Sequence, residues 1–198
     1  MELIFATNNA HKVDELRAVL PPGFGIRSLR EAGIDQDIPE PHDTLEANAL
    51  EKAQVIAART GGDCFSEDTG LEVAALNGAP GVHSARYAGE DRAPTANMDK
   101  LLRALAGKPD RSARFRTIIC LCLRGSVHYF EGICPGTITT APSGSGGFGY
   151  DPVFIPDGGD GRSFAEMSFT EKGRFSHRRK AVDKLVAFLK QTHENPHW

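Results

Sequence analysis

The chain has 198 residues, of which 40% are hydrophobic and 25% charged, with a formal net charge of -3. This length suits one globular core, and the composition excludes a disordered or fibrous chain. A surface that wraps duplex nucleic acid needs an excess of lysine and arginine, so we expect no nucleic-acid polymer as a partner. The first residues lack a basic segment and a long apolar run. We therefore expect no signal peptide and no membrane span, and a cytoplasmic location.

The N-terminal part of the chain alternates strand and helix patterns. Residues 3–6 are typical of a short buried strand, and apolar residues at helical spacing then predict a helix that ends at Pro21-Pro22-Gly23. A second helix is predicted to begin near Asp43, because Asp43 and Glu46 have capping-box spacing. It should end at Gly61-Gly62.

Hairpin patterns dominate the later part of the chain. The predicted elements are strands at 63–66 and 71–76, an amphipathic helix from Pro94 to Leu105, paired strands at 113–124 and 127–133, and a last helix around 182–189. This order predicts an α/β fold with a mixed central sheet and flanking helices. We expect one domain over residues 1–198, in which the tail 193–198 is frayed.

The four cysteines do not form a recognisable metal motif. They are Cys64, Cys120, Cys122 and Cys134, without C-x-x-C spacing or histidines at zinc-finger distance. Cys120 and Cys122 are two apart in an apolar run, so on a strand they share one face. We expect small buried side chains in a reducing compartment rather than a metal or redox site.

A first polar cluster, Thr7-Asn8-Asn9-Ala10-His11-Lys12, lies between the first predicted strand and helix. Unpaired backbone N–H groups and the positive end of the helix dipole favour an anion at such a place. Lys12 adds a mobile cation. The alternative is a plain strand-to-helix turn in which Asn9 caps the helix.

A second cluster is acidic and contains Glu40, Glu67 and Asp68. Glu67 and Asp68 follow a predicted strand, and adjacent side chains of an extended backbone point to opposite sides. Carboxylate oxygens suit Mg²⁺, and a carboxylate beside a metal ion can orient or deprotonate a water molecule. The alternative is a solvated turn.

A third cluster is the glycine-rich stretch 144–152. It matches G-x-G-x-x-G, but the dinucleotide motif requires a helix next, whereas residues 151–155 have the pattern of a strand. A loop with Phe148, Tyr150 and Asp151 suits a nucleobase better, because rings stack on bases and glycines let the backbone approach.

A fourth cluster is basic and consists of Lys172 and the run 176–180, at the start of the last helix. Cations at a helix N-terminus oppose the helix dipole, so we expect an acidic or electron-rich group to compensate them. The alternative is a solvated basic face.

Taken together, these motifs resemble the inosine triphosphate pyrophosphatase family, which acts on non-canonical purine nucleoside triphosphates. The matching segments are T-N-N-A-H-K at 7–12, S-E-D-T-G-L at 66–71, G-A-P-G-V-H-S-A-R-Y at 78–87, G-G-F-G-Y-D-P at 146–152, and E-K with S-H-R between 171 and 178. They occur in the order of the family and cover nearly the whole chain.

The resemblance implies a two-lobed mixed α/β fold with the active site in a cleft between the lobes, a homodimer, and dependence on Mg²⁺. It implies that Thr7 to Lys12 and Lys52 hold the triphosphate, that Asp68 is the proton acceptor, and that Glu40 and Asp68 bind the metal ion. The remaining implied substrate contacts are Thr69, Phe148, Gly149, Tyr150, Asp151, Lys172, His177 and Arg178.

Two departures from the family pattern stand out. Glu67 occupies a position where many relatives have aspartate, which leaves a metal role for Glu67 open, and the run 174–176 is bulkier than expected.

The basic cluster agrees with a purine that carries a keto group at C6. Lysine and arginine donate hydrogen bonds and cannot accept them, so adenine, with an amino group at C6, would leave a donor unpaired. Guanine shares the keto group, and its rejection is not explained by these residues. Two alternatives remain: a pyrophosphatase for modified pyrimidine or methylated nucleotides, and a nucleotide-binding regulator without catalysis.

Overall fold

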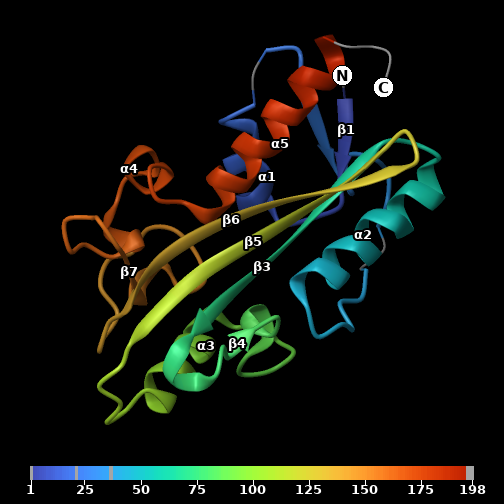
Figure 1. Ribbon diagram of the computed structural model, residues 1–198. Coiled ribbons are helices and arrows are strands. Elements are labelled where there is room, and N and C mark those ends of the chain that lie inside the picture. The colour runs from blue at the N-terminus through green and yellow to red at the C-terminus, as the bar shows by residue number, and fades with distance from the viewer. Residues whose placement is uncertain (1, 21, 36–37, 195–198) are drawn as a thin grey trace. The chain divides into compact units, whose positions relative to one another are not determined.

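The computed structural model describes residues 2–20, 22–35 and 38–194, and it confirms a mixed α/β fold (Figure 1). The helices are α1 (Ala10–Arg17), α2 (Leu45–Thr60), α3 (Pro94–Ala104), α4 (Phe169–Gly173) and α5 (His177–Glu194). The strands are β1 (Glu2–Phe5), β2 (Gly25–Ser28), β3 (Cys64–Val73), β4 (Pro80–Gly81), β5 (Ser112–Leu123), β6 (Ser126–Ile138) and β7 (Phe154–Pro156). The strand order is β2-β1-β3-β5-β6-β7, and β4 pairs with β3. The sheet is mixed because β1 runs parallel to β2 and β3, whereas β4 and β7 are antiparallel to their neighbours.

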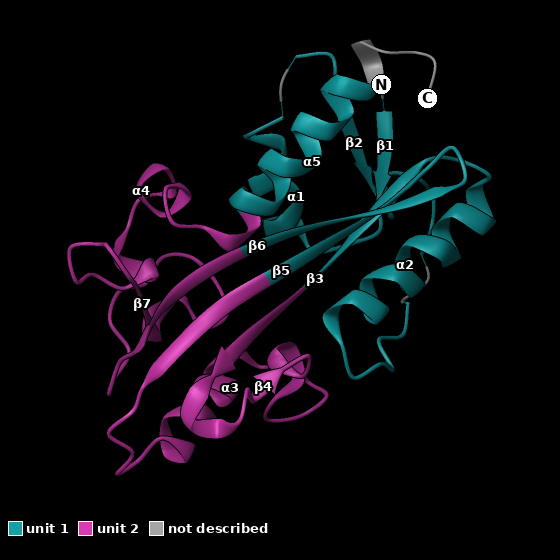
Figure 2. Ribbon diagram, viewed as in Figure 1, with its two compact units in different colours: residues 1–68, 117–132, 179–198 teal, residues 69–116, 133–178 magenta. Residues whose placement is uncertain are grey.

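The chain divides into two compact units, shown in separate colours in Figure 2. Unit 1 consists of residues 1–68, 117–132 and 179–198, and unit 2 of residues 69–116 and 133–178. Each unit has its own cluster of buried apolar side chains. The polar clusters predicted from the sequence are therefore described unit by unit.

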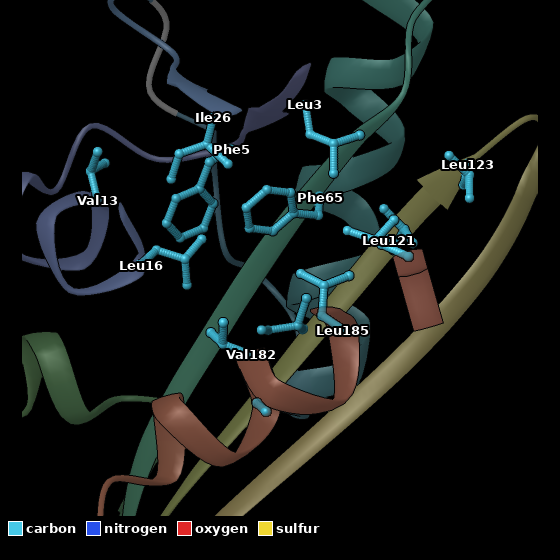
Figure 3. Packing of buried hydrophobic residues seen from close by; sticks show 13 residues of the cluster. Leu3, Phe5, Val13, Leu16, Ile26, Phe65, Leu121, Leu123, Val182 and Leu185 are labelled. Carbon is cyan, nitrogen blue, oxygen red and sulfur yellow. The ribbon is translucent and has the colours of Figure 1, made fainter. Parts of the chain in front are cut away.

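The core of unit 1 fills one face of its part of the sheet (Figure 3). Phe5 of β1 and Phe65 of β3 stack with ring centroids 4.6 Å apart. Val182 and Leu185 of α5 pack into the same cluster, as the helical spacing of the last helix predicts. Phe65 has no exposed surface, so it lies at the centre of this core.

Replacing Phe65 by alanine is expected to cost about 3 to 5 kcal/mol of unfolding free energy, because the lost ring leaves a cavity that the stacked Phe5 cannot fill. Urea unfolding followed by circular dichroism measures this loss. Phe169→Ala is the matched control, since Phe169 is 55% exposed, and it should cost less than about 0.5 kcal/mol. Equal losses in the two variants would contradict this placement of Phe65.

The core of unit 2 is built around aromatic rings. Phe115 of β5 lies edge-on to Phe154 of β7 at 4.6 Å, and Phe164 packs on both. Leu101 of α3 is fully buried in the same cluster, in agreement with the predicted amphipathic helix. The basic residues of this unit pack against these rings.

The prediction of separate strands at 63–66 and 71–76 was wrong, because β3 is one strand from Cys64 to Val73. Gly70 is not a turn residue: a side-chain carbon there would overlap the backbone of Gly81 in β4, which pairs with β3. The acidic pair Glu67 and Asp68 therefore lies within a buried strand. The sequence pattern was misleading because charged residues and glycine usually interrupt a strand.

Several element boundaries also differ from the predictions. Thr44 rather than Asp43 caps α2, since its side chain accepts from the Ala47 N–H group. Residues 151–153 form a 3-10 turn, and only 154–156 are a strand. The predicted hairpin and the last helix are confirmed. Of the tail predicted to be frayed, residues 195–198 lie outside the described part of the chain.

The four cysteines are free and buried, as the sequence predicts. Burial raises the pKa of Cys64 and of Cys120 to about 12, which keeps both thiols protonated and unreactive at neutral pH. Within residues 2–20, 22–35 and 38–194, no helix has the length and apolar character needed to cross a membrane.

Candidate active site

The alternation of β3 sends its two neighbouring carboxylates to opposite faces of the sheet in unit 1. Ser66 and Cys64 bond to backbone carbonyls of α2, so even-numbered residues face α2. Asp68 lies on this face, whereas Glu67 lies on the face of Phe65 and contacts Lys12 of α1. The opposite orientation inferred from the sequence is confirmed.

Lys52 gathers three oxygen atoms on the α2 face. Its Nζ donates to Glu40 Oε1 at 2.6 Å, to the Glu67 backbone carbonyl at 2.8 Å and to Asp68 Oδ1 at 3.3 Å. An ammonium group has three N–H donors, so these contacts use its full capacity. Lys52 and Asp68 are both more than nine-tenths buried. We call Glu40, Glu67, Asp68, Lys12 and Lys52 the carboxylate cluster.

The charges of the carboxylate cluster shift one another's proton affinity. Burial raises the pKa of Asp68 above its usual value, and the nearby Glu40 charge adds to this, while Lys52 and Lys12 oppose it. Burial disfavours the charge of Lys52, but the Asp68 and Glu40 carboxylates outweigh burial and raise its pKa. Asp68 is therefore a carboxylate with increased basicity beside a permanent cation.

The donor set of this cluster fits a hard divalent cation. Glu40 and Asp68 direct carboxylate oxygens at the same nitrogen atom, so they can share one cation. In the described part of the chain, no three His, Cys, Asp or Glu side chains form a group that could hold a metal ion alone. Mg²⁺ binds well at such sites, because it uses one or two carboxylates together with water and substrate phosphate oxygens.

The segment from Thr7 to Lys12 begins α1, as predicted. Asn9 caps the helix by accepting from the Lys12 N–H group, and the Thr7 hydroxyl accepts from the Asn9 N–H group. Asn8, Asn9, Ala10 and His11 are exposed. Lys12 is held by Glu67, whose Oε1 lies 2.9 Å from its Nζ. The Asn9 cap, which the sequence offered as the alternative to an anion site, is present. An anion can still reach the segment from solvent, because residues 8–11 are exposed.

A second cluster in unit 2 is organised by Asp151. Its Oδ2 accepts from Lys172 Nζ at 2.7 Å and from the Phe148 N–H group at 2.9 Å. Asp151 and Lys172 are both buried. A side-chain carbon at Gly147 would overlap the Asp151 carboxylate, so glycine is required there for the loop to fold over it.

Aromatic rings surround the basic residues of unit 2. Lys172 Nζ lies 5.1 Å from the centroid of the Phe148 ring, and the Arg178 guanidinium lies 5.4 Å from the same ring. The His177 ring stacks on Phe115 with centroids 4.6 Å apart. The expectation of electron-rich compensation at this helix start is confirmed, because rings attract cations through their faces. Phe148, Asp151, Lys172, His177 and Arg178 are called the basic aromatic cluster below.

The remaining predicted contacts lie near these clusters in different environments. Thr69 follows Asp68 in β3 and is half-buried, as are Phe148 and Gly149. The Tyr150 hydroxyl donates to the Ser84 carbonyl at 2.8 Å, and the ring is buried in the core of unit 2. Burial raises the pKa of Tyr150. The Phe148 ring, which is half-buried, is therefore the more accessible of the two rings of this loop.

Sequence reasoning missed Asn48. It is fully buried on α2, and its amide contacts Asp68 Oδ2 and the backbone of His42. The signal was present, because Asn48 and Lys52 are four residues apart on the apolar stripe that also carries Ala49 and Ile56. Polar side chains at such positions require partners.

Comparison with known proteins identifies the family of the chain. Residues 3–188 match the sequence pattern described as Ham1 family. The chain belongs to the Ham1 family. The resemblance inferred from the five motifs is thereby confirmed over almost the full length of this Ham1 chain.

Two dITP/XTP pyrophosphatases resemble this Ham1 chain over nearly their entire lengths. A dITP/XTP pyrophosphatase of Porphyromonas gingivalis is 54% identical, with 95% of this chain and 97% of the relative covered. One of Flavobacterium psychrophilum is 48% identical, covering 96% of this chain and all of the relative. The structure of a HAM1 protein from Coxiella burnetii has a TM-score of 0.89 at 35% identity, covering 96% of this chain and 99% of that one.

Proposed function

We propose that this chain hydrolyses non-canonical purine nucleoside triphosphates, dITP, ITP or XTP, to the nucleoside monophosphate and pyrophosphate, with Mg²⁺ as cofactor. The observation that carries the proposal is the carboxylate cluster, in which Lys52 holds Asp68 and Glu40 together. The names of the relatives, dITP/XTP pyrophosphatases, support the substrate class. A regulator without catalysis would not need a buried carboxylate of raised pKa beside a cation.

In this reaction Asp68 accepts the proton of the attacking water. The water oxygen forms a bond to the α- or the β-phosphorus, and the bond between that same phosphorus and the oxygen that bridges the two breaks. The bridging oxygen leaves with the other phosphorus, so the products are the monophosphate and pyrophosphate. A carboxylate whose pKa is raised by burial is a better general base than an exposed one. Lys52 keeps the Asp68 carboxylate in place and supplies positive charge for the phosphate oxygens.

The triphosphate is held by residues of α1 and α2. Thr7, Asn8, Asn9, Ala10, His11 and Lys12 offer backbone N–H groups, polar side chains and a cation at the start of α1. Glu40 and Asp68 would hold Mg²⁺, which when bound neutralises charge on the phosphate oxygens. Glu67 is assigned to Lys12 rather than to the metal ion, because its carboxylate lies on the opposite face of β3.

The purine is assigned to the basic aromatic cluster. Phe148 offers a ring for stacking, while Lys172, His177 and Arg178 offer donors to a keto oxygen at C6. Asp151 accepts a bond from Lys172 Nζ and so holds this ammonium group beside the Phe148 ring. Thr69 and Gly149 complete the assigned contacts. The homodimer and the cytoplasmic location, which the family resemblance implies, are part of the same proposal.

Product analysis tests this function. With dITP and Mg²⁺, the expected products are dIMP and pyrophosphate in equal amounts, separated by ion-exchange chromatography. Comparing dITP, XTP, GTP, dUTP and methylated-base nucleotides tests the substrate class. Release of orthophosphate and a diphosphate, or a preference for dUTP or for a methylated-base nucleotide over dITP and XTP, would overturn the proposal.

A further inference from the structure

Asn48 makes three side-chain hydrogen bonds, one to the proposed metal ligand Asp68 and two to the backbone of His42, two residues after Glu40. We propose that Asn48 is a positioning residue for the reaction, which sets the Asp68 carboxylate and the segment of Glu40 in the arrangement that binds the metal ion. This inference rests on the proposed function. Asn48 acts through Asp68, to which its amide donates, and through His42, whose segment carries Glu40.

Both N–H donors of the Asn48 amide are used, and its oxygen also accepts a bond. Its Oδ1 accepts from the His42 N–H group at 2.9 Å. Its Nδ2 donates to the His42 carbonyl at 3.2 Å and to Asp68 Oδ2 at 3.3 Å. An amide nitrogen has two N–H donors, so one points at the loop and the other at the carboxylate. The orientation of the amide is therefore fixed from two sides.

Asp68 is held at both of its oxygen atoms. Lys52 contacts Oδ1 and Asn48 contacts Oδ2, and both side chains come from the same face of α2, one turn apart. With both oxygens restrained, rotation of the carboxylate is hindered. Asn48 orients the Asp68 carboxylate without adding charge, whereas Lys52 both orients it and adds a positive charge.

The contact with His42 extends the effect to Glu40. The residues are connected as Glu40-Pro41-His42, and proline fixes its own backbone torsion and restricts the residue before it to extended conformations. Two backbone bonds to Asn48 hold His42, and the His42 ring also contacts Glu51 of α2. Through this short, stiff connection, the position of Asn48 constrains the position of Glu40, whose Oε1 contacts Lys52.

Unit 2 contains a matched case without this connection. Asn97 of α3 is also buried; its Oδ1 accepts from the Ala88 N–H group at 2.6 Å, and its Nδ2 donates to the Ala85 carbonyl at 3.0 Å. Both asparagines therefore fasten a loop to a helix through backbone bonds. Only Asn48 adds a bond to a carboxylate of the carboxylate cluster, so comparing the two separates loop attachment from positioning.

The test compares wild-type protein with Asn48→Ala and Asn97→Ala. Binding of Mn²⁺ alone is measured by the electron paramagnetic resonance signal of the free ion, and turnover of dITP by pyrophosphate release. We expect Asn48→Ala to weaken Mn²⁺ binding about 10-fold or more and to lower kcat by about 10- to 100-fold. KM for dITP at saturating metal should stay within about threefold. Asn97→Ala should lower the melting temperature similarly but leave Mn²⁺ binding and kcat within about threefold.

The outcomes distinguish this inference from the proposed function. If wild-type protein binds Mn²⁺ and releases pyrophosphate, but Asn48→Ala behaves like Asn97→Ala in both assays, Asn48 is only a loop fastener and the inference fails. If wild-type protein neither binds Mn²⁺ nor releases pyrophosphate, the proposed function fails first, and the inference with it.

A second variant covers the case in which Asn48→Ala does not fold. Asn48→Asp keeps the volume and the acceptor for the His42 N–H group, but it places a carboxylate where Asp68 needs a donor. We expect its kcat to fall at least about 10-fold at saturating Mg²⁺. Turnover within about threefold of wild type would overturn the inference.

Discussion

Asp68→Asn is expected to lower kcat for dITP by about 10²- to 10⁴-fold in saturating Mg²⁺, the usual contribution of a positioned general base. The asparagine side chain has nearly the same shape and keeps an oxygen for Lys52, but it cannot accept the proton of the water. Pyrophosphate release under steady-state conditions measures the loss. Binding of a non-hydrolysable dITP analogue should persist, because the triphosphate contacts assigned to α1 are unchanged.

The same variant is expected to be more stable than wild type when metal is absent. Because the folded pKa of Asp68 is raised, the fold favours the protonated acid, and the stability contributed by Asp68 is lost as the pH rises through its folded pKa. At neutral pH asparagine removes this cost, so the melting temperature in chelator should rise, by about 2 to 4 °C for each kcal/mol gained.

A matching consequence is that wild-type turnover should fall on the acid side at a pH above the usual pKa of aspartate.

Glu72→Gln is the control for Asp68, because Glu72 lies on the same strand and pairs with Arg114 of β5. It should change kcat less than about twofold. Asp68→Asn with wild-type kcat would show that Asp68 is not the base, and a lower melting temperature in chelator would contradict the direction of its pKa shift.

The second large effect concerns discrimination between bases. Replacing Lys172 by methionine removes a donor assigned to the keto oxygen, and combining it with Asp151→Asn avoids leaving a buried carboxylate without its lysine. We expect kcat/KM for dITP to fall by about 10²-fold or more while that for dATP changes little. The ratio of the two kcat/KM values, measured by pyrophosphate release, is the readout.

Two further variants make this result interpretable. Asp151→Asn alone shows how much of the change in the ratio comes from the loop rather than from Lys172, since Asp151 also accepts from the Phe148 N–H group. Lys184→Met removes an exposed cation whose Nζ donates to the Glu131 carbonyl, and it should leave the ratio unchanged. A double variant that keeps the wild-type preference for dITP over dATP would show that the base is read elsewhere.

The chemistry of the candidate site was more predictable than its connections. The alternation rule correctly placed Glu67 and Asp68 on opposite sides of their strand, but it could not assign a helix to either side. Lys12 and Lys52 are 40 positions apart in the chain, and the sequence offers no means of pairing each with its own carboxylate. The structure pairs Lys12 with Glu67 and Lys52 with Asp68.

Errors arose where tertiary contacts overrode a local signal. Gly70 has the appearance of a turn residue in the sequence, but it lies within β3. Glycine is required there because β4 approaches its backbone closely. The contact of Tyr150 with the base or sugar, which the resemblance implies, stays a prediction, and the structure adds that its hydroxyl donates to the carbonyl of Ser84, distant in sequence. Asn48 was overlooked although it lies on the apolar stripe of α2, and only the structure shows its partners His42 and Asp68.

The sequence by itself determined the fold class, the main helices, the family and the inventory of acids, bases and rings. These depend on periodicity, composition and motif order, which are local properties of the chain. Only the tertiary structure decided which lysine neutralises Glu67 and which holds Asp68, and that Asn48 fastens Asp68 and the Glu40 segment to one helix. The physical reason is that hydrogen bonds and desolvation depend on distances between residues far apart in the chain, and folding alone sets those distances.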